Sequence, residues 1–328
     1  MSEEVTAILV ADVGGTYARL AWARPGDGRV PRILDYRRYV CAEHADLATI
    51  LRRYRRELVD SGIAAPDVAV VAIAGVLDGD CLLNTNLPWP VSVEQTCADA
   101  GLRTLRLVND FQALAHAIGH ADPAAMRCLT GPPLHVARWP ALVLGPGTGL
   151  GAALRLDSVD HPVLSSEVGH AALAAGTELE MDIVRLLAAR HGHVDNERIL
   201  SGPGLVNLHR CLGELRGVAA PWSTPAEILD AAASGEALAV EGVQVFCGWL
   251  GSLAGDLAIT FGARTVYLAG GITAHLAQWL DDGRFLRRYL DKGALSPALR
   301  RVPVWCVEHG QLGVIGAAAW HGDGMGER

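Results

Sequence analysis

The stretch Ile8–Trp22, ILVADVGGTYARLAW, decides the fold. Two apolar runs flank a patch that holds one acid, two adjacent glycines and a threonine. Apolar runs joined across Gly14-Gly15 predict a β-hairpin, because glycine tolerates the positive φ angles of tight turns. A turn alone does not account for Asp12, which stands where a buried strand should end in apolar residues. The stretch taken alone therefore leaves two interpretations open, a simple turn or a turn whose tip also carries a functional acid.

Length and composition bound the class of protein. The chain has 328 residues, enough for two medium domains, and 50% of them are hydrophobic, enough for sizeable cores. Its formal net charge of -8 argues against nucleic acid or an anionic membrane as partner, because both select a basic face. Backbone N–H groups can still bind an anion locally, so phosphate ligands remain open.

The chain also predicts a cytoplasmic location. Residues Met1–Glu4 are acidic where a signal peptide needs positive charge, and the 7 cysteines form no C-x-C or C-x-x-C pair. Such cysteines are typical of reduced thiols and of a chain without a metal cluster. The longest apolar stretch, Val243–Thr260, contains Gln244 and Asp256 and indicates a buried helix rather than a membrane span.

Short apolar runs that end in Gly, Asn or Asp alternate with helical patterns, which predicts an α/β fold with mixed sheets. The expected strands are Ala7–Ala11, Val68–Ile73, Leu105–Val108, Ala141–Leu144 and Thr265–Ala269. The expected helices are Asp46–Val59, Gln112–Gly119, Glu178–His191 and Glu236–Phe261. Thr177 and Glu180 have the spacing of a capping box, Gly192 should end the helix they begin, and Pro203 suits the first turn of another.

A second glycine loop resembles the first. ALVLGPGTG (Ala141–Gly149) again runs from an apolar strand into a Gly-rich turn with Thr, so two halves of the chain could each present a phosphate loop. It is not a dinucleotide fingerprint, because the third glycine would fall at Leu150 or Ala152. A Walker loop is excluded, since the chain has a single lysine, Lys292, which follows Asp291. If the chain binds nucleotide phosphates, it has no lysine clamp at these loops and must use backbone amides, Thr hydroxyls and a metal ion.

Phosphoryl transfer also needs a base for the acceptor hydroxyl and an acid that anchors magnesium. Asp110 follows a strand that ends at Val108 and precedes a helical pattern, so it is a candidate base. An Asp at such a junction is often only an N-cap, and taken alone the pattern favours that interpretation. Asp12, at the mouth of the first glycine turn, is the candidate for the metal.

Six ordered motifs resemble those of the bacterial glucokinases, which have the two-domain hexokinase–actin–Hsp70 fold, a ribonuclease H-like α/β fold with mixed sheets and an interdomain cleft. They are DVGGTYARL (Asp12–Leu20), VNDFQAL (Val108–Leu114), GPGTGLG (Gly145–Gly151), EVGH (Glu167–His170), ERILSGPGL (Glu197–Leu205) and YLAGGI (Tyr267–Ile272). The resemblance covers nearly the whole chain, from about residue 7 to 319. The related ROK sugar kinases carry a cysteine-rich zinc motif that this chain lacks, which places it with the zinc-free glucokinases.

The resemblance implies a role for each site residue. Asp110 is the catalytic base that takes the proton of the sugar 6-hydroxyl, and Asp12 helps to hold Mg²⁺. The residues that bind the sugar are Asn109, Asp110, Glu167, His170 and Glu197. The residues that bind ATP are Asp12, Gly14, Gly15, Thr16, Gly147, Thr148, Gly149, Gly270 and Gly271. A small domain, residues 1–120 with 310–328, should close on a large domain, residues 121–309, and the protein should be a homodimer.

Some residues keep a second interpretation, and two depart from the family. Glu197 could be a solvated helix residue, while Glu167 and His170 form no di-iron site, since a second E-x-x-H is missing. Tyr17 stands where the family commonly has Asn and could narrow the cleft or pack outward along the strand. Val168 replaces a glycine and restricts the backbone beside two sugar ligands. Both departures bear on affinity and sugar selectivity.

The sequence therefore predicts an ATP-dependent glucokinase that makes glucose 6-phosphate, a step of glycolysis, from glucose and MgATP. Two alternatives remain: a kinase for another hexose such as mannose or fructose, and a sugar-sensing regulator that has lost catalysis. The intact Asp110 and the absence of an added DNA-binding segment argue against the regulator. The donor could also be ADP or polyphosphate, which the motifs do not separate from ATP.

Overall fold

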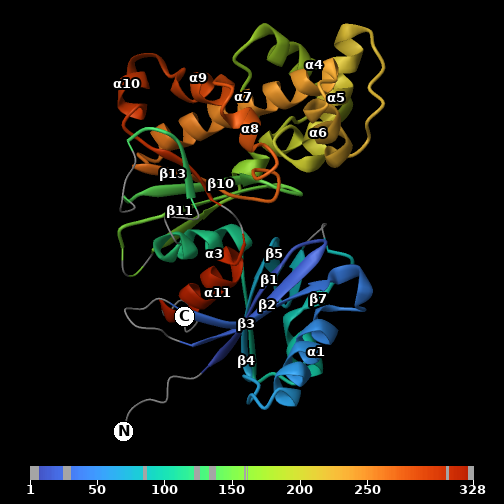
Figure 1. Ribbon diagram of the computed structural model, residues 1–328, viewed down its shortest axis with the longest axis vertical. Coiled ribbons are helices and arrows are strands. Elements are labelled where there is room, and N and C mark those ends of the chain that lie inside the picture. The colour runs from blue at the N-terminus through green and yellow to red at the C-terminus, as the bar shows by residue number, and fades with distance from the viewer. Residues whose placement is uncertain are drawn as a thin grey trace. The chain divides into compact units, whose positions relative to one another are not determined.

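The computed structural model describes residues 7–24, 31–83, 87–121, 126–132, 138–158, 160, 162–307 and 310–323. The chain divides into two compact units (Figure 1). The first unit comprises Met1–Ala121, Ser158–Val163 and Gly310–Arg328, and the second comprises Asp122–Asp157 and Leu164–His309. Each unit is built around one large mixed sheet with helices packed on it. The predicted α/β class is confirmed.

The sheet of the first unit has the order β3-β2-β1-β4-β8. These strands are β1 (Ile8–Val13), β2 (Tyr17–Arg24), β3 (Arg32–Val40), β4 (Val68–Ile73) and β8 (Thr104–Val108). The predicted opening hairpin is confirmed, because β1 and β2 pair antiparallel with Val13 opposite Ala18 and Asp12 opposite Arg19. β1, β4 and β8 run parallel, so their carboxyl ends meet at one edge of the sheet.

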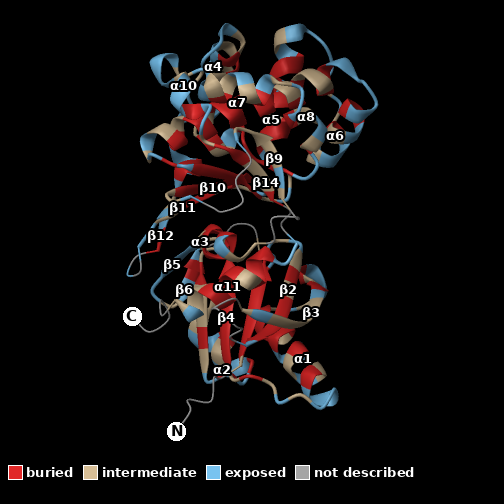
Figure 2. Cartoon of the chain, turned by 60° about the vertical axis from the view of Figure 1, so that its left-hand side comes forward, coloured by how far each residue is buried: buried red, intermediate tan, exposed pale blue. Residues whose placement is uncertain are grey.

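Helices cover both faces of this sheet (Figure 1). Leu9 and Ala11 of β1 pack against α1 (Leu47–Asp60), whereas Ile8 and Val10 face α11 (Leu312–Gly322) and α3 (Asp110–Ala117). This alternation follows from the two-residue period of a strand and leaves the central strands buried on both sides (Figure 2). The unit also contains α2 (Val93–Asp99), η2 (Cys41–Glu43), η3 (Ile118–His120) and a small sheet of β5 (Val76–Asp78), β6 (Cys81–Leu83) and β7 (Val91–Ser92).

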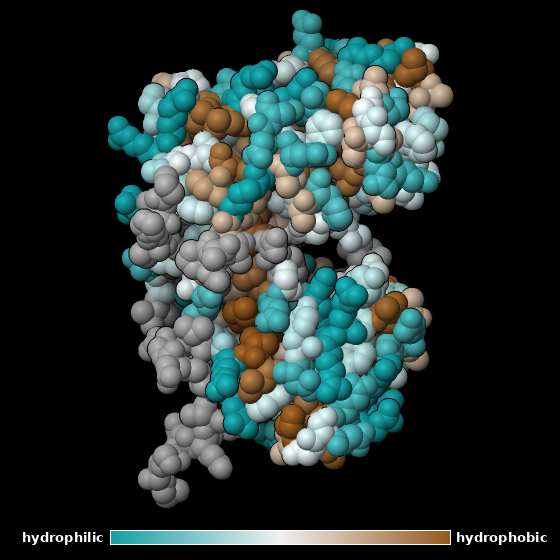
Figure 3. Space-filling model, in the orientation of Figure 1, coloured by the Kyte–Doolittle hydropathy of each residue, from teal (hydrophilic) through white to brown (hydrophobic). Residues whose placement is uncertain are grey.

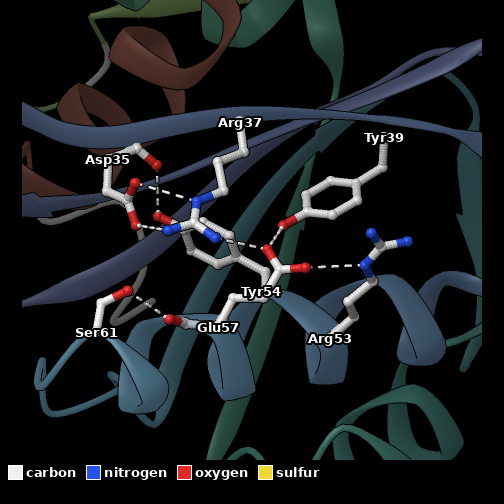
Figure 4. A network of polar contacts seen from close by, with 7 residues as sticks. All are labelled: Asp35, Arg37, Tyr39, Arg53, Tyr54, Glu57 and Ser61. Atoms are coloured by element: carbon white, nitrogen blue, oxygen red, sulfur yellow. Dashed lines mark hydrogen bonds and ion pairs between the residues drawn. The ribbon is translucent and has the colours of Figure 1, made fainter.

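The edge strand β3 is fastened to α1 by a polar network centred on Glu57 (Figure 4). The Glu57 carboxylate accepts hydrogen bonds from Arg37 and Tyr39 of β3, each at 2.7 Å, and from Arg53 of α1 at 2.9 Å. Burial alone would raise the pKa of Glu57, but these hydrogen bonds outweigh it and lower the pKa from 4.5 to about 2. The network therefore favours the ionised carboxylate in the folded chain.

Substituting Glu57→Gln is expected to destabilise the protein by roughly 1–3 kcal/mol at pH 7. Because the folded pKa lies below the unfolded one, the wild-type carboxylate stabilises the fold above about pH 4.5 and loses this contribution as the pH falls toward 2. Denaturant unfolding at pH 7, 5, 4 and 3 should show the difference between wild type and variant shrinking through this window. A difference that stays constant with pH would show that the ionised carboxylate is not the stabilising form.

The second unit repeats the strand order of the first. Its sheet has the order β12-β11-β10-β13-β14-β9. As in the first unit, an antiparallel hairpin (β10 and β11) is followed in the sheet by two parallel strands, β13 and β14, and β9 is added antiparallel at the far edge. The strands are β9 (Met126–Thr130), β10 (Ala141–Pro146), β11 (Leu150–Arg155), β12 (Val163–Ser166), β13 (Thr265–Leu268) and β14 (Val304–Val307). The two glycine loops are therefore the tips of corresponding hairpins, β1–β2 and β10–β11.

Helices pack on the second sheet around the long buried α7 (Ala237–Thr260). The others are α4 (Glu178–His191), α5 (Gly202–Arg216), α6 (Pro225–Ala233), α8 (Ala277–Leu280), α9 (Arg284–Leu290), α10 (Ser296–Leu299), η5 (Val168–His170), η6 (Asn196–Arg198) and η7 (Gly293–Leu295). Gly251 lets α9 lie directly on α7, since a Cβ there would stand 2.2 Å from the Phe285 carbonyl oxygen. Lys292, just after α9, pairs with Asp256 of α7 at 3.0 Å.

Among the described residues, α7 is the one helix long and apolar enough to cross a membrane, and 67% of its most apolar window is buried inside the protein. The expectation of a buried helix at Val243–Thr260 is confirmed. Among the exposed large apolar side chains, Val76, Leu77 and Leu83 lie together on the β5–β6 hairpin, whereas others are apart, for example Val59 on α1 and Met181 on α4. Figure 3 shows hydrophobic residues interspersed among hydrophilic ones on the visible face.

The expected strands and helices are all present, with ends that differ by no more than three residues. Gly192 ends α4 with a φ of +73°, and Pro203 lies in the first turn of α5, as expected. Of the capping box predicted at Thr177 and Glu180, the half made by Thr177 is confirmed and the half made by Glu180 is wrong. The Thr177 hydroxyl accepts from the Glu180 amide, but the Glu180 carboxylate accepts from the Gly176 amide and pairs with Arg288, a partner distant in sequence.

Candidate active site

The β1–β2 turn is a closed backbone loop. The Gly14 amide donates to the Tyr17 carbonyl at 3.0 Å, and the Cys41 amide donates to the Thr16 carbonyl at 2.9 Å. The buried Cys41 thiol donates to the Gly14 carbonyl at 3.3 Å. No described residue accepts a hydrogen bond from the amides of Gly15 or Thr16. The turn thus presents two backbone donors, the arrangement that binds anions.

Asp12 lies beside this turn and is only 5% exposed. Its Oδ2 accepts from Nη1 of Arg19, the residue opposite it in the hairpin, at 3.2 Å. The carboxylate packs on the start of α11, where a Cβ at Gly313 would stand 2.4 Å from the Asp12 Cγ. Sequence reasoning missed Gly313, because only the folded chain brings residue 313 to residue 12.

At the start of α3, the structure shows which of the neighbouring residues Asn109 and Asp110 is the N-cap of the helix. Asn109 is the N-cap, and its Oδ1 accepts from the amides of Phe111 and Gln112 at 3.0 and 3.1 Å. The interpretation of Asp110 as an N-cap is therefore wrong. Asp110 is the first residue of the helix, where the aligned peptide dipoles stabilise a negative charge. The Nδ2 amide of Asn109 has no acceptor among the described residues and can donate to a ligand.

The β10–β11 turn holds the second glycine loop. The Gly147 amide donates to the Gly149 carbonyl at 2.8 Å, and the Gly147 carbonyl accepts from Gly202 at the start of α5. Glu197 Oε2 accepts from the Leu150 amide at 2.8 Å. A Cβ at Gly149 would stand 2.5 Å from that oxygen, so a larger residue there would displace the Glu197 carboxylate. Glu197 is thus not a solvated helix residue, because its carboxylate is fixed on the loop.

The turn after β13 lies against the same loop. Gly270 has a φ of +98°, and a Cβ there would stand 2.6 Å from the Pro146 carbonyl oxygen. A Cβ at Gly145 would stand only 2.0 Å from the Ala269 carbonyl oxygen. Gly271 is exposed, with open space around its Cα. The structure therefore brings Gly147–Gly149 and Gly270–Gly271 together.

The residues expected to bind the sugar in the second unit lie on two short 3₁₀ helices. Glu167 is the N-cap of η5 and His170 is its last residue, both are exposed, and Glu197 lies in η6. Asn196 joins the helices, because its Nδ2 donates to the Val168 carbonyl at 2.9 Å and its amide donates to the Ala171 carbonyl. The Val168 side chain is 8% exposed and packs in the core, so this departure from the family points away from the sugar residues.

Two residues beside His170 were missed by sequence reasoning. Asp195 Oδ2 lies 3.6 Å from His170 Nδ1, and His193 Nε2 lies 3.2 Å from the His170 carbonyl oxygen. Asp195 also caps η6 by accepting from the Arg198 amide. An Asp two residues before Glu197 was a readable N-cap signal, but its proximity to His170 was not.

The expected site residues form two sets, one in each unit. The first set is Asp12, Gly14, Gly15, Thr16, Asn109 and Asp110. The second set is Gly147, Thr148, Gly149, Glu167, His170, Glu197, Gly270 and Gly271. Within the first unit, α11 contacts both the Asp12 carboxylate, through Gly313, and the Ala113 carbonyl of α3, through Gly316. The first set can bind an anion and hold a base, and the second set combines an amide loop with polar side chains suited to a polyol.

The family model described as "Glucokinase" matches residues 9–323. A "Glucokinase-like protein" of Xylella fastidiosa (strain Temecula1) is 43% identical over 323 residues, which cover 97% of this chain and 95% of that protein. A glucokinase of Aromatoleum aromaticum is 39% identical over 315 residues, or 94% of this chain and 93% of that protein. The crystal structure of a glucokinase from an Antarctic psychrotroph is similar with a TM-score of 0.81 at 34% identity, covering 95% of this chain and 98% of that one.

Proposed function

The chain belongs to the glucokinase family and is an ATP-dependent hexose kinase, and we propose that its two residue sets transfer the γ-phosphoryl group of ATP to the 6-hydroxyl of glucose. One observation carries the assignment of roles. Asn109 caps α3, and the adjacent carboxylate of Asp110, which accepts from the Phe111 amide at 2.9 Å, is held at the positive end of the helix. A carboxylate so placed suits the general base of a kinase.

In the proposed reaction, Asp110 accepts the proton of the 6-hydroxyl as the oxygen attacks the γ-phosphorus. The bond between that phosphorus and the β,γ-bridging oxygen breaks in line, and ADP leaves with the electron pair. The amides of Gly15 and Thr16, and those of Thr148 and Gly149 in the second loop, bind the phosphates. Asn109, Glu167, His170 and Glu197 bind the other sugar hydroxyls, and Gly270–Gly271 lie on the adenosine side.

Asp12 is the residue proposed to face Mg²⁺. A buried carboxylate beside a phosphate turn suits this ion, which typically takes one or two carboxylates and phosphate oxygens and keeps several waters. When bound, Mg²⁺ would neutralise charge on the transferring phosphate. Arg19 holds the Asp12 side chain in one orientation, which prepares it for that role.

The rest of the proposal concerns the whole protein. We propose that residues 1–120 with 310–328 act as a small domain and residues 121–309 as a large one. Closure of the two over the sugar would exclude water, a competing acceptor of the phosphoryl group. A cytoplasmic homodimer acting in glycolysis completes the proposal.

The test is a coupled assay of the purified chain with MgATP and, in parallel, glucose, mannose and fructose. We expect glucose to give the highest kcat/KM. ADP or polyphosphate in place of ATP should give little turnover. If mannose or fructose gave the higher kcat/KM, that hexose and not glucose would be the preferred substrate. No turnover with any hexose would overturn the proposed reaction.

Glu167→Gln and His170→Ala are expected to raise the KM for glucose by about tenfold or more, because removing one partner of a hydrogen bond that the bound sugar buries costs roughly 1–3 kcal/mol. The KM for ATP should stay nearly constant. Glu178→Gln is the matched control, since Glu178 is an exposed carboxylate in the first turn of α4. A rise in the KM for ATP with that for glucose unchanged would reverse the assignment of sugar and nucleotide residues.

A further inference from the structure

We propose that Arg38 is a phosphate-binding residue that Tyr17 holds in place beside the first glycine turn. The inference deepens the proposed function and rests on it. Its starting point is a contact between neighbouring strands: the Arg38 guanidinium carbon lies 4.6 Å from the centre of the Tyr17 ring. Tyr17 is one of the two residues at which the chain departs from the glucokinase pattern, and the stack shows which neighbour its ring packs against.

Tyr17 belongs to the turn itself. Its carbonyl accepts the hydrogen bond from Gly14 that closes the loop, and it follows Thr16 directly. Tyr17, on β2, lies opposite Val40 of β3. Arg38 is two residues before Val40, so the side chains of Arg38, Val40 and Tyr17 project on the same side of the sheet. The guanidinium group is therefore anchored on a residue that helps to form the proposed phosphate turn.

Arg38 also projects on the face of the sheet that carries Asp12. Arg19 lies opposite Asp12 on one side and opposite Arg38 on the other, and residues directly opposite in antiparallel strands share a face. The neighbours of Arg38 support this. Arg37 and Tyr39 both reach Glu57 on α1, which covers the other face, and the residue between them must point the opposite way (Figure 4).

The charge of Arg38 is available for a ligand. Among the described residues, Arg38 forms no ion pair, whereas Arg19 is engaged by Asp12 and Arg37 by Asp35 and Glu57. The only lysine of the chain, Lys292, lies in the second unit. A triphosphate bound at the turn needs cations, and a guanidinium matches phosphate oxygens in a bidentate way. Stacking on Tyr17 restricts the long side chain beforehand, which lowers the entropic cost of binding.

The experiment measures the Kd for MgATP by calorimetry and the KM values for MgATP and glucose. Arg38→Gln is expected to raise the Kd and the KM for MgATP by about tenfold or more, with the KM for glucose within about twofold of wild type. Tyr17→Asn should raise the Kd for MgATP by roughly threefold, since the arginine remains but loses its support. The double variant should be no weaker than Arg38→Gln alone, because the ring acts through the arginine.

Arg24→Gln is the matched control. Arg24 stacks on Trp22 at 4.5 Å in the same hairpin, at the end of β2 away from the turn. We expect this variant to keep the wild-type Kd for MgATP. Equal losses for Arg24→Gln and Arg38→Gln would mean that stacking supports only the hairpin and would overturn the inference.

The failures can be told apart. Unchanged MgATP affinity in Arg38→Gln, with active wild type, overturns the role of Arg38 and leaves the proposed function intact. Wild-type protein that binds MgATP but phosphorylates no hexose overturns the proposed function, and the Kd values still decide the role of Arg38. Wild-type protein that does not bind MgATP overturns both.

Discussion

Asp110→Asn is expected to fold and to bind glucose while kcat falls by about 10²–10⁴-fold, the usual contribution of a general base. The amide has nearly the shape of the carboxylate, and its oxygen can still accept from the Phe111 amide, a contact of 2.9 Å in the wild type. It cannot take a proton from the 6-hydroxyl. The measurement is kcat with saturating glucose and MgATP, together with the thermal shift that glucose produces.

Asp46→Asn is the matched control for this variant. Asp46 is the N-cap of α1, and its carboxylate accepts from the Thr49 amide at 2.6 Å, so the same change is made at another helix start of the first unit. We expect kcat to be unchanged there, since Asn is an equally good N-cap. Turnover of Asp110→Asn within threefold of wild type would remove Asp110 from the mechanism.

Of the variants proposed here, Gly316→Ala is expected to lose the most stability. An added Cβ would stand 2.0 Å from the Ala113 carbonyl oxygen and 2.4 Å from its carbon, both backbone atoms of α3. Two helices must therefore move apart, which should destabilise the first unit by about 3 kcal/mol or more and lower its Tm by roughly 6–12 °C. Because α3 begins at Asp110, kcat measured at a temperature where the variant is folded should fall as well.

Gly322→Ala tests the same change in the last residue of α11. A Cβ there meets nothing within 4 Å, so this variant should be as stable as wild type or slightly more so, since alanine is the better helix former. If Gly316→Ala unfolds at the wild-type temperature, α3 and α11 are less tightly packed than the structure has them.

Much of the fold could be predicted from local pattern. The strands β4 and β10 are buried on both faces and appear in the sequence as unbroken apolar runs, and α4 has an N-cap and a terminal glycine. The hairpin at Gly14-Gly15 could also be predicted, because two apolar runs flank a pair of glycines. The strand β3 was not, because RILDYRRYV carries four charges and derives its stability from Glu57 on α1 and from pairing with β2.

The site divides in the same way. Asp12, Asp110 and the glycine loops stand at the ends of readable elements, so the motifs locate them. Whether Asn109 or Asp110 caps α3 depends on the exact residue at which the helix begins. A sequence pattern does not locate a helix end to within one residue. The partners Gly313 of Asp12, Asp195 of His170 and Arg38 of Tyr17 are brought together by tertiary packing between distant segments.

The near-absence of lysine has a consequence for the chemistry of the protein's surface. Of its 28 basic residues only Lys292 is a lysine, and its ammonium group is tied to Asp256 with the side chain 11% exposed. Acetyltransferases and amine-reactive dyes therefore find no exposed lysine to modify, and guanidinium groups stay charged up to strongly alkaline pH. Lysine acylation therefore has a single, mostly buried target in this enzyme, and site-specific labelling is better directed to a thiol such as the exposed Cys81.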